Sequence, residues 1–330
     1  MNIVLTGSLG NISKPLATEL IAKGHLVTII SSKDDKQKDI EALGAKAAIG
    51  SIKDIAFLTA TFTGADIVYC MEPPIDQSRL FNPSYTVTEM LNEMDNIAGN
   101  YKHAILKSGV KKVIHLSSIG AHTDKGNGIL KFHYYAEKVL NQLPAHVSIK
   151  FMRPVGFYYN LLANAQMIKQ LSKGFVGAFM ALRYYGLGGL LSGKRGVIVS
   201  NVGDNDINLM VSPFDIASVI AEEMEQPFNG RTFRYIASEE LTCNETAKIL
   251  GEAIDKPYLK WGRISDKQLF KAMVGMKMSP TWVQGFVEMQ ASGRGKNCRL
   301  YEDYYRHRPV LGKTKLKDFA EEFAKAYNQD

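Results

Sequence analysis

The chain has 330 residues, of which 45% are hydrophobic, so it can bury a large core and is too apolar to be disordered. Its 40 basic and 33 acidic residues give a net charge of +7, which favours an anionic partner but fits a nucleotide phosphate as well as a nucleic acid. Three widely spaced cysteines argue against a disulfide framework and a zinc site. We therefore expect a cytoplasmic protein without a signal peptide.

The first thirty residues predict a strand, a helix and a second strand. Residues 2–6 and 25–30 are continuously apolar, and residues 14–23 between them carry apolar side chains at helical spacing. Helical stretches such as 89–107 separate the further strands that we expect at 46–49, 66–71, 112–117 and 148–152. Because this alternation is typical of a parallel sheet covered on both faces, we predict a Rossmann-type doubly wound α/β fold.

This regular alternation ends near residue 156. We predict an NAD(P)-binding lobe over residues 1–156 and a smaller α/β substrate-binding lobe over 157–330, with 196–236 returning in part to the first lobe. The glycine-rich apolar segment 174–195 is a poor membrane span because Arg183 and several glycines interrupt it. We expect it to form a lid over a pocket.

A basic, tyrosine-containing tail between Arg294 and Lys317 has the ingredients of a nucleic-acid site. Glu302 and Asp303 interrupt it, and residues 315–327 predict an amphipathic closing helix. We therefore expect neither a nucleic acid nor a membrane as partner, and a homodimer remains open.

The stretch from Thr6 to Ser13 connects the first strand to the first helix. Glycines there let backbone N–H groups and the helix N-terminus approach a pyrophosphate, and the strand, turn and helix context predicts a dinucleotide site. Ser13 stands where a third glycine is expected, and serine is small enough to be tolerated. The contacts predicted in this turn are Gly7, Ser8, Gly10, Asn11 and Ile12.

The end of the second strand decides between NADP and NAD. Ser31, Ser32 and Lys33 offer two hydroxyls and an ammonium to a ribose 2′-phosphate, so we favour NADP(H). The alternative is that Lys33 is solvated and that Asp34 or Asp35 binds the ribose 2′-hydroxyl of NAD.

Three motifs follow the glycine turn: His-Leu-Ser-Ser at 115–118, His133 with Glu137 four residues later, and Arg-Pro-Val-Gly-Phe-Tyr-Tyr-Asn at 153–160. Together they resemble the NmrA-like family of atypical short-chain dehydrogenases/reductases, in the branch of the triphenylmethane and NADPH-dependent quinone reductases. The resemblance implies a Rossmann lobe for NADP(H) and a smaller substrate lobe. It adds cofactor contacts at Ser51, Met71, Glu72, Pro73, His133 and Phe157, and a substrate pocket at Tyr158, Tyr159 and Asn160, where core filling is the alternative for the two tyrosines.

Two candidate catalytic pairs share the helix near residue 133. Tyr134 and Lys138 have the spacing of the proton-donating pair of typical short-chain dehydrogenases, but at about 100° per residue they point away from the apolar stripe. His133 and Glu137 lie on its flank, and the family resemblance implies that His133 holds the nicotinamide ribose. Its pKa, near 6.5 when unperturbed, would also permit proton transfer. The alternative is an ordinary surface pair of His133 with Glu137.

We expect an NADP(H)-dependent oxidoreductase that reduces an apolar aromatic, carbonyl-like or quinone-like molecule by hydride transfer, without a metal ion. His133 and Ser117 are the expected catalytic residues, the latter as a hydrogen-bond donor to a substrate oxygen or, alternatively, as a loop cap. The alternative function is a non-catalytic NADP(H)-binding, redox-sensing regulator that acts through a protein partner.

Overall fold

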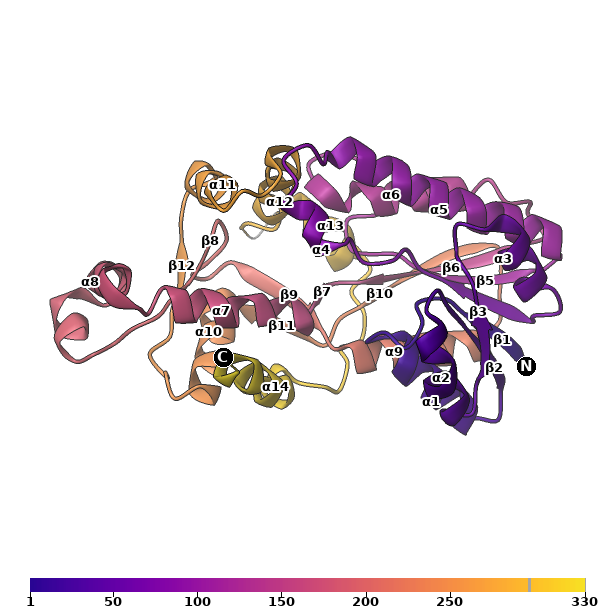
Figure 1. Cartoon of the computed structure of the whole chain (residues 1–330), viewed down its shortest axis with the longest axis horizontal. Coiled ribbons are helices and arrows are strands. Elements are labelled where there is room, and N and C mark those ends of the chain that lie inside the picture. Colours follow the sequence, from indigo (N-terminus) through magenta and orange to yellow (C-terminus); the bar gives the residue numbers. More distant parts are fainter. Residues whose placement is uncertain (296–297, 330) are drawn as a thin grey trace.

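A computed structural model describes residues 1–295 and 298–329; Lys296 of the basic tail lies outside the described residues. Within these residues, seven parallel strands form one twisted sheet (Figure 1). The first βα units run outward in opposite directions from the centre, which confirms the predicted Rossmann-type fold. In sheet order the strands are β10 (Arg231–Ile236), β6 (Ser148–Pro154), β5 (Lys112–Leu116), β4 (Ile67–Cys70), β1 (Asn2–Leu5), β2 (Leu26–Ser31) and β3 (Lys46–Ile49).

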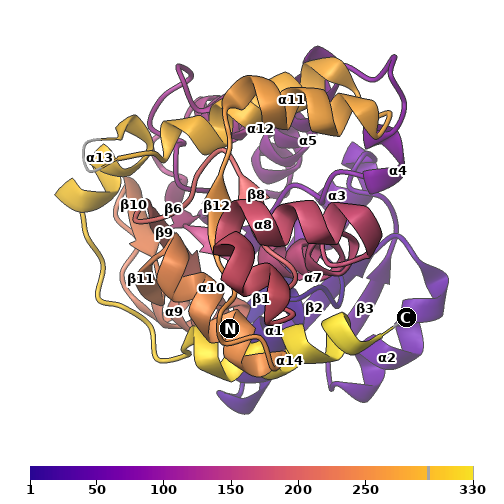
Figure 2. The ribbon, with the colours of Figure 1, turned by 90° about the vertical axis from the view of Figure 1, so that its left-hand side faces the viewer.

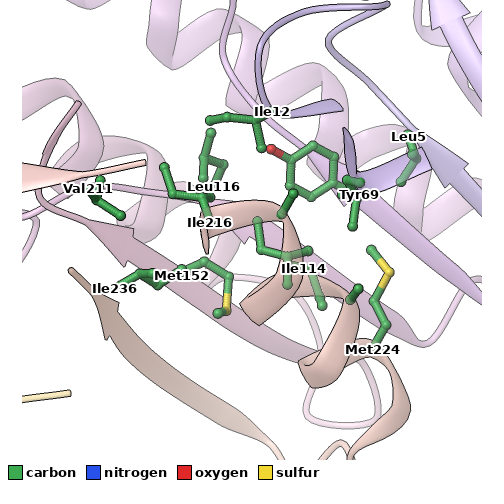
Figure 3. Close-up of a cluster of buried hydrophobic side chains, with 14 of the residues drawn as sticks. Leu5, Ile12, Tyr69, Ile114, Leu116, Met152, Val211, Ile216, Met224 and Ile236 are labelled. Carbon is green, nitrogen blue, oxygen red and sulfur yellow. The ribbon is translucent and has the colours of Figure 1, made fainter. Parts of the chain in front are cut away.

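Helices cover both faces of this sheet. On one face α1 (Ser13–Ala22), α2 (Gln37–Ala42) and α9 (Pro213–Glu225) bury the cluster drawn in Figure 3, in which Ile114 and Met152 of the sheet meet Ile216 of α9. The other face is covered by α3 (Ile55–Phe62), α5 (Val87–Ser108) and α6 (Lys131–Leu140). Because both faces are buried, the central strands β1 and β4 are almost entirely apolar.

The longest helix, α5, has clear signals at both ends. Thr86 accepts a hydrogen bond from the backbone of Glu89, whose carboxylate bonds back to the Thr86 N–H, and Gly109 ends the helix in the left-handed conformation with φ 75°. These caps fix the length of the helix that supports β4 and β5.

The second lobe contains two small sheets. One holds β11 (Glu239–Thr242), β9 (Ile207–Val211) and β7 (Gly156–Phe157), and the other β12 (Trp261–Arg263) and β8 (Ile198–Ser200). Part of the later chain, β10 and α9, lies with the first lobe. The remaining helices are α4 (Gln77–Leu80), α7 (Ala163–Gln170), α8 (Gly174–Leu191), α10 (Cys243–Ala253), α11 (Asp266–Gly275), α12 (Pro280–Ser292), α13 (Arg299–Arg306) and α14 (Leu316–Asn328).

The segment expected to be a lid forms α8 instead. Figures 1 and 2 place this helix at the end of the second lobe that points away from β1, β2 and β3. Gly186, with φ 69° and ψ −176°, interrupts the helix near its C-terminal end. Over the described part of the chain, the structure contains no helix that is long and apolar enough to cross a membrane.

A close helix contact joins the lobes. The 3-10 turn Gly128–Leu130 packs against α12, and Gly128 has φ +55°. A Cβ at this position would overlap the carbonyl oxygen of Gly285 and stand 2.5 Å from the backbone nitrogen of Met289. Only glycine fits there without moving backbone.

We predict that Gly128→Ala lowers the free energy of unfolding by about 3 kcal/mol, because it adds backbone overlap to an unfavourable positive φ. Gly99→Ala is the matched control: Gly99 lies inside α5 with open space around its Cβ position, so alanine should raise stability by about 0.5 kcal/mol. Urea unfolding of the three proteins measures both changes. Equal stabilities for the two variants would contradict the packing described here.

Candidate active site

The glycine turn between β1 and α1 is too tightly packed for side chains at its centre. Gly7 has φ +90°, and a Cβ on it would stand 2.5 Å from Oγ of Ser13 and 2.6 Å from Sδ of Met71. Ser13 is only 1% exposed, and its hydroxyl donates to the Thr6 carbonyl at 2.9 Å. Serine at the third small position therefore ties α1 to β1 and leaves the turn intact.

A chain of hydrogen bonds joins this turn to the end of β2. Ser8, at φ 53°, donates from Oγ to Oγ of Ser31 at 3.0 Å, and the same Ser31 oxygen accepts from the Lys33 N–H at 3.2 Å. Ser31 is 2% exposed, so its hydroxyl positions the loop and is not free for a phosphate, which corrects its predicted role. Ser32 and Lys33 are exposed, and so are Asp34 and Asp35.

The remaining predicted contacts along this edge differ in accessibility. Asn11 and Ser51 are exposed, whereas Ile12 is buried in the core. Pro73 is half-buried. The edge therefore offers exposed polar side chains from the ends of β1, β2 and β3.

The family resemblance implied that the backbone of Met71 lies along the cofactor. In the structure, both polar groups of this backbone are already hydrogen-bonded within the protein. Its N–H donates to Oγ1 of Thr6 at 2.9 Å, and its carbonyl accepts from the hydroxyl of Tyr101 at 2.7 Å. Its side chain lies beside Gly7 and Ser13 instead. Met71 therefore shapes the wall of the turn.

Glu72 and His115 form a buried pair at the ends of β4 and β5. Nε2 of His115 lies 3.0 Å from Oε1 and 3.1 Å from Oε2 of the carboxylate. Burial disfavours the charged form of each group, but their mutual attraction outweighs it, so the pKa of Glu72 is lowered and the pKa of His115 is raised. The carboxylate of Glu72 therefore points at His115, and the pairing favours the charged form of each group.

His133 on α6 lies within the field of this pair. Burial lowers its pKa to about 3 despite the opposing effect of the Glu72 carboxylate, and the positive charge of His115 adds to the lowering. Its Nδ1 is shielded from water and has no hydrogen-bond partner among the residues that the structure describes. The imidazole is therefore neutral at physiological pH and keeps one nitrogen for a ligand.

Glu137, four residues after His133, bonds other groups. It accepts from Nε of Arg153 at 2.9 Å, from Nη2 at 2.7 Å, and from the hydroxyl of Ser117 at 2.6 Å. All three side chains are buried, so the surface pair of His133 with Glu137 is ruled out. The Ser117 hydroxyl, expected to reach a substrate, is engaged by Glu137.

Arg153 extends this network into the second lobe. Its Nη1 bonds the carboxylate of Asp303 at 3.3 Å, and the hydroxyl of Tyr235 donates to the same oxygen at 2.6 Å. Asp303 belongs to α13, so the arginine before Pro154 connects β6, α6 and α13.

The alternative pair on α6 is not assembled for proton transfer. Lys138 is exposed and Tyr134 is half-buried, with its ring edge-on to Tyr135 at 5.4 Å between centroids. The helix-face argument from the sequence agrees with this placement of Lys138, whereas Tyr134 is less exposed than expected.

The aromatic segment after β6 divides between core and surface. Tyr158 is buried in the core of the second lobe, stacks on Phe319 of α14 at 5.6 Å, and donates from its hydroxyl to Glu239 at 2.9 Å. Tyr159 packs edge-on against the same phenylalanine, and Asn160 is exposed. Core filling, the alternative for both tyrosines, is what their contacts show. Phe157, in β7, is half-buried against the first core cluster.

Sequence reasoning missed two charged partners. His115 was noted only within its motif, and Arg153 only as the start of a motif. A charged residue inside an apolar strand was the available signal, because such a residue needs a buried partner.

The arrangement fits a dinucleotide. The tight cradle at Gly7, the exposed Ser32 and Lys33, and the unpartnered Nδ1 of His133 lie along the carboxyl edge of one parallel sheet, where open α/β sheets bind ligands. In the described residues, histidine, cysteine and carboxylate side chains form no cluster that could hold a metal ion.

Comparison with known proteins agrees with this fit. Residues 7–148 match the model of an NAD(P)H-binding family. Triphenylmethane reductase from Citrobacter sp. shares the fold with TM-score 0.68 at 16% identity, over 98% of this chain and 100% of that one. The NADPH-dependent quinone oxidoreductase of Escherichia coli, solved with NADPH, has the same score and identity over 97% and 99% of the two chains.

A nucleoside-diphosphate-sugar epimerase from Staphylococcus aureus is equally similar, with TM-score 0.68 and 16% identity over 97% of this chain and 100% of that one. No curated protein sequence matches the chain. At these identities the solved structures show a shared fold. The family match adds that residues 7–148 resemble an NAD(P)H-binding domain.

We predict that Glu72→Gln lowers the free energy of unfolding by about 3 kcal/mol, since His115 then loses its buried counter-ion. Because the pKa of Glu72 is lowered in the folded state, its ionised form stabilises the fold above about pH 4.3, the pKa of an unfolded glutamate. Because the pKa of His115 is raised, its protonated form stabilises the fold fully below about pH 6.5, the pKa of an unfolded histidine. The loss should therefore be largest between these values and shrink as the pH rises through the folded pKa of His115. Chemical denaturation from pH 4 to 9 measures it.

Glu225→Gln is the control for this variant. Glu225 also faces a histidine, His25 at 3.3 Å, but on the surface, where solvent screens the pair. Its substitution should leave stability nearly unchanged. A Glu72→Gln effect that is small or independent of pH would show that the pair is not charged.

Proposed function

Because residues 7–148 form an NAD(P)H-binding domain and the whole chain folds like two reductases, we propose that the protein is an NADP(H)-dependent oxidoreductase. Its substrate would be an apolar aromatic, carbonyl-like or quinone-like small molecule. The observation that carries the proposal is the half-buried His133, whose water-shielded Nδ1 has no partner among the described residues and lies beside the Glu72 and His115 pair.

Several groups of the chain would hold NADP(H). The turn from Gly7 to Ile12 and the N-terminus of α1 suit the pyrophosphate, because a helix N-terminus carries N–H groups without partners inside the helix and the positive end of the helix dipole. Ser32 and Lys33 suit a 2′-phosphate, which supports NADP over NAD, and Ser51 lies at the adjacent strand end. When bound, NADPH supplies the hydride, while the chain orients it and excludes water.

His133 acts in this proposal as a hydrogen-bonding group and not as an acid. A pKa of about 3 keeps the imidazolium form scarce, so the proton-delivery role that the sequence permitted is replaced by binding of a ribose hydroxyl or a substrate oxygen. A fixed neutral imidazole can stabilise negative charge that develops on such an oxygen. Desolvation is the largest influence on this neutral state; the charge of Glu72 opposes it and the charge of His115 favours it.

We also propose that the protein works in the cytoplasm. The described cysteines, Cys70, Cys243 and Cys298, are free thiols buried at separate places, which suits a reducing compartment.

One observation favours a second candidate, an NADP(H)-responsive regulator that acts through a protein partner. The Ser117 hydroxyl is engaged by Glu137, and Lys138 faces water, so neither stands ready as a proton donor. Mixing the protein with NADPH and a panel of quinones and triphenylmethane dyes distinguishes the two functions. Loss of nicotinamide absorbance supports the reductase, whereas tight NADPH binding without turnover of any acceptor supports the regulator.

We predict that His133→Ala lowers kcat/KM by about 10²-fold, because it removes a fixed hydrogen-bonding group from the reacting centre. Tyr134→Phe, at the next position of the same helix, should change the rate by less than about twofold. Initial rates with NADPH and the best acceptor of the panel measure both. If Tyr134→Phe abolished activity and His133→Ala did not, the assignment of His133 would be wrong.

We predict that Lys33→Ala weakens NADPH binding by about tenfold and leaves NADH binding unchanged, since one charge-assisted hydrogen bond to the 2′-phosphate is lost. Lys38→Ala, which removes another exposed lysine from the neighbouring helix α2, is the control. Fluorescence titration of both nucleotides measures the ratio. Equal weakening of NADPH and NADH would refute a 2′-phosphate contact at Lys33.

A further inference from the structure

Helix α8 exposes large apolar side chains at the end of the second lobe, where Figure 2 shows it in front. Phe175 is 87% exposed and Phe179 is 54% exposed, and Leu182 follows them on the same helix face. Beyond the irregular Gly186, Leu187 and Leu191 are exposed as well, the latter by 78%. Contiguous apolar exposure of this kind marks an interaction surface.

The helix is oriented opposite to the usual pattern of a surface helix. Its buried positions are the small residues Gly177, Ala181 and Gly189, while its phenylalanines and leucines face outward. Packing within the chain therefore does not explain why this face is apolar. The surface needs a partner outside the chain.

Positive charge surrounds this face. The chain from 154 to 203 contains no aspartate or glutamate. Lys173 directly precedes α8, exposed Arg183 lies on it, and Lys194 and Arg195 follow it. Lys260, also exposed, donates to the carbonyl of Tyr184 on the same helix. Burial and the charge of Asp204 raise the pKa of Tyr184, and the charge of Arg183 lowers it.

We propose that α8 docks in the plane of an anionic lipid bilayer, with Phe175, Phe179 and Leu182 among the headgroups and acyl chain ends and the basic side chains at the lipid phosphates. Exposed aromatic and aliphatic side chains flanked by lysine and arginine are the chemistry that anionic membrane surfaces recognise. The helix lies on the bilayer and does not cross it.

A second copy of the chain fits this surface less well. In a two-fold contact each α8 faces the same surface of its partner, so the positive charges of Lys173 and Arg183 from both copies would be brought into one interface. With no acidic residue in 154–203, that segment offers no neutralising charge. The expectation that the protein has no membrane partner is therefore replaced by peripheral attachment, an inference that is independent of the proposed enzyme activity.

Sedimentation of the full chain with vesicles tests this inference. We expect the protein to bind vesicles that contain phosphatidylserine, to bind pure phosphatidylcholine vesicles at least tenfold more weakly, and to be released by salt. Phe179→Ser should weaken binding by about tenfold, because it removes one inserted aromatic side chain. Phe81→Ser is the matched control, since Phe81 is equally exposed, 54%, but lies beside α4.

Arg183→Glu provides a second variant that tests charge and leaves the apolar face intact. It should reduce binding to the anionic vesicles by about tenfold or more. Thermal melting and NADPH affinity of each variant, expected to match the wild type, show that the fold is preserved. Vesicle binding without any turnover would count against the reductase while supporting this inference.

Three results would overturn the inference. The first is that the protein does not bind phosphatidylserine vesicles. The second is that Phe179→Ser and Phe81→Ser weaken vesicle binding equally. The third is that the wild type is a dimer, that Phe179→Ser converts it to a monomer, and that neither binds vesicles. Light scattering after size exclusion gives the oligomeric state for the last of these.

Discussion

Two buried ion pairs at the carboxyl edge of the parallel sheet hold the site in shape. Glu72 with His115 joins β4 to β5, and Glu137 with Arg153 joins α6 to β6. Buried charges of this kind are costly unless they are fully paired, so each pair fixes the relative position of its elements. Among the residues that the structure describes, Nδ1 of His115 and Nδ1 of His133 are shielded from water and have no hydrogen-bond partner, and His133 belongs to neither pair.

In the proposed function, the imidazole of His133 would take the place of an assembled tyrosine and lysine pair beside the nicotinamide. The glycine turn at Gly7 places a cradle for phosphate at one point of the sheet edge, and His133 offers a neutral nitrogen at another. In the proposed function the protein would orient and shield bound NADPH, which would supply the hydride. If α8 attaches the second lobe to a bilayer, apolar substrates dissolved in that bilayer would lie close to the second lobe.

The local architecture could be predicted well, and the pairings between distant residues could not. The strand and helix periods gave β1, α1 and β2 within a few residues, since continuous apolar runs and helical spacing are local signals. The partners of Glu72 and Glu137 were missed, because the sequence does not state which strands are neighbours or where each side chain points. Ser31 and Tyr158 show the same limit: residue type suggested a ligand contact, whereas tertiary packing buries both. The helix over residues 174–191 was not expected either, because its small residues pack inward and leave its apolar side chains exposed.

We propose above that His133 is a half-buried, neutral ligand for the cofactor. Nitrogen NMR of protein labelled at histidine, with His133 assigned by the loss of its signals in His133→Ala, tests it most directly. We expect the nitrogen shifts of His133 to be those of a neutral imidazole and to stay constant from pH 5 to 8, a range that includes the pKa of about 6.5 of a free histidine. We also expect them to change when NADPH is added. A His133 signal that titrates near pH 6.5, or whose shift does not change at saturating NADPH, would show that His133 is not a neutral ligand for the cofactor.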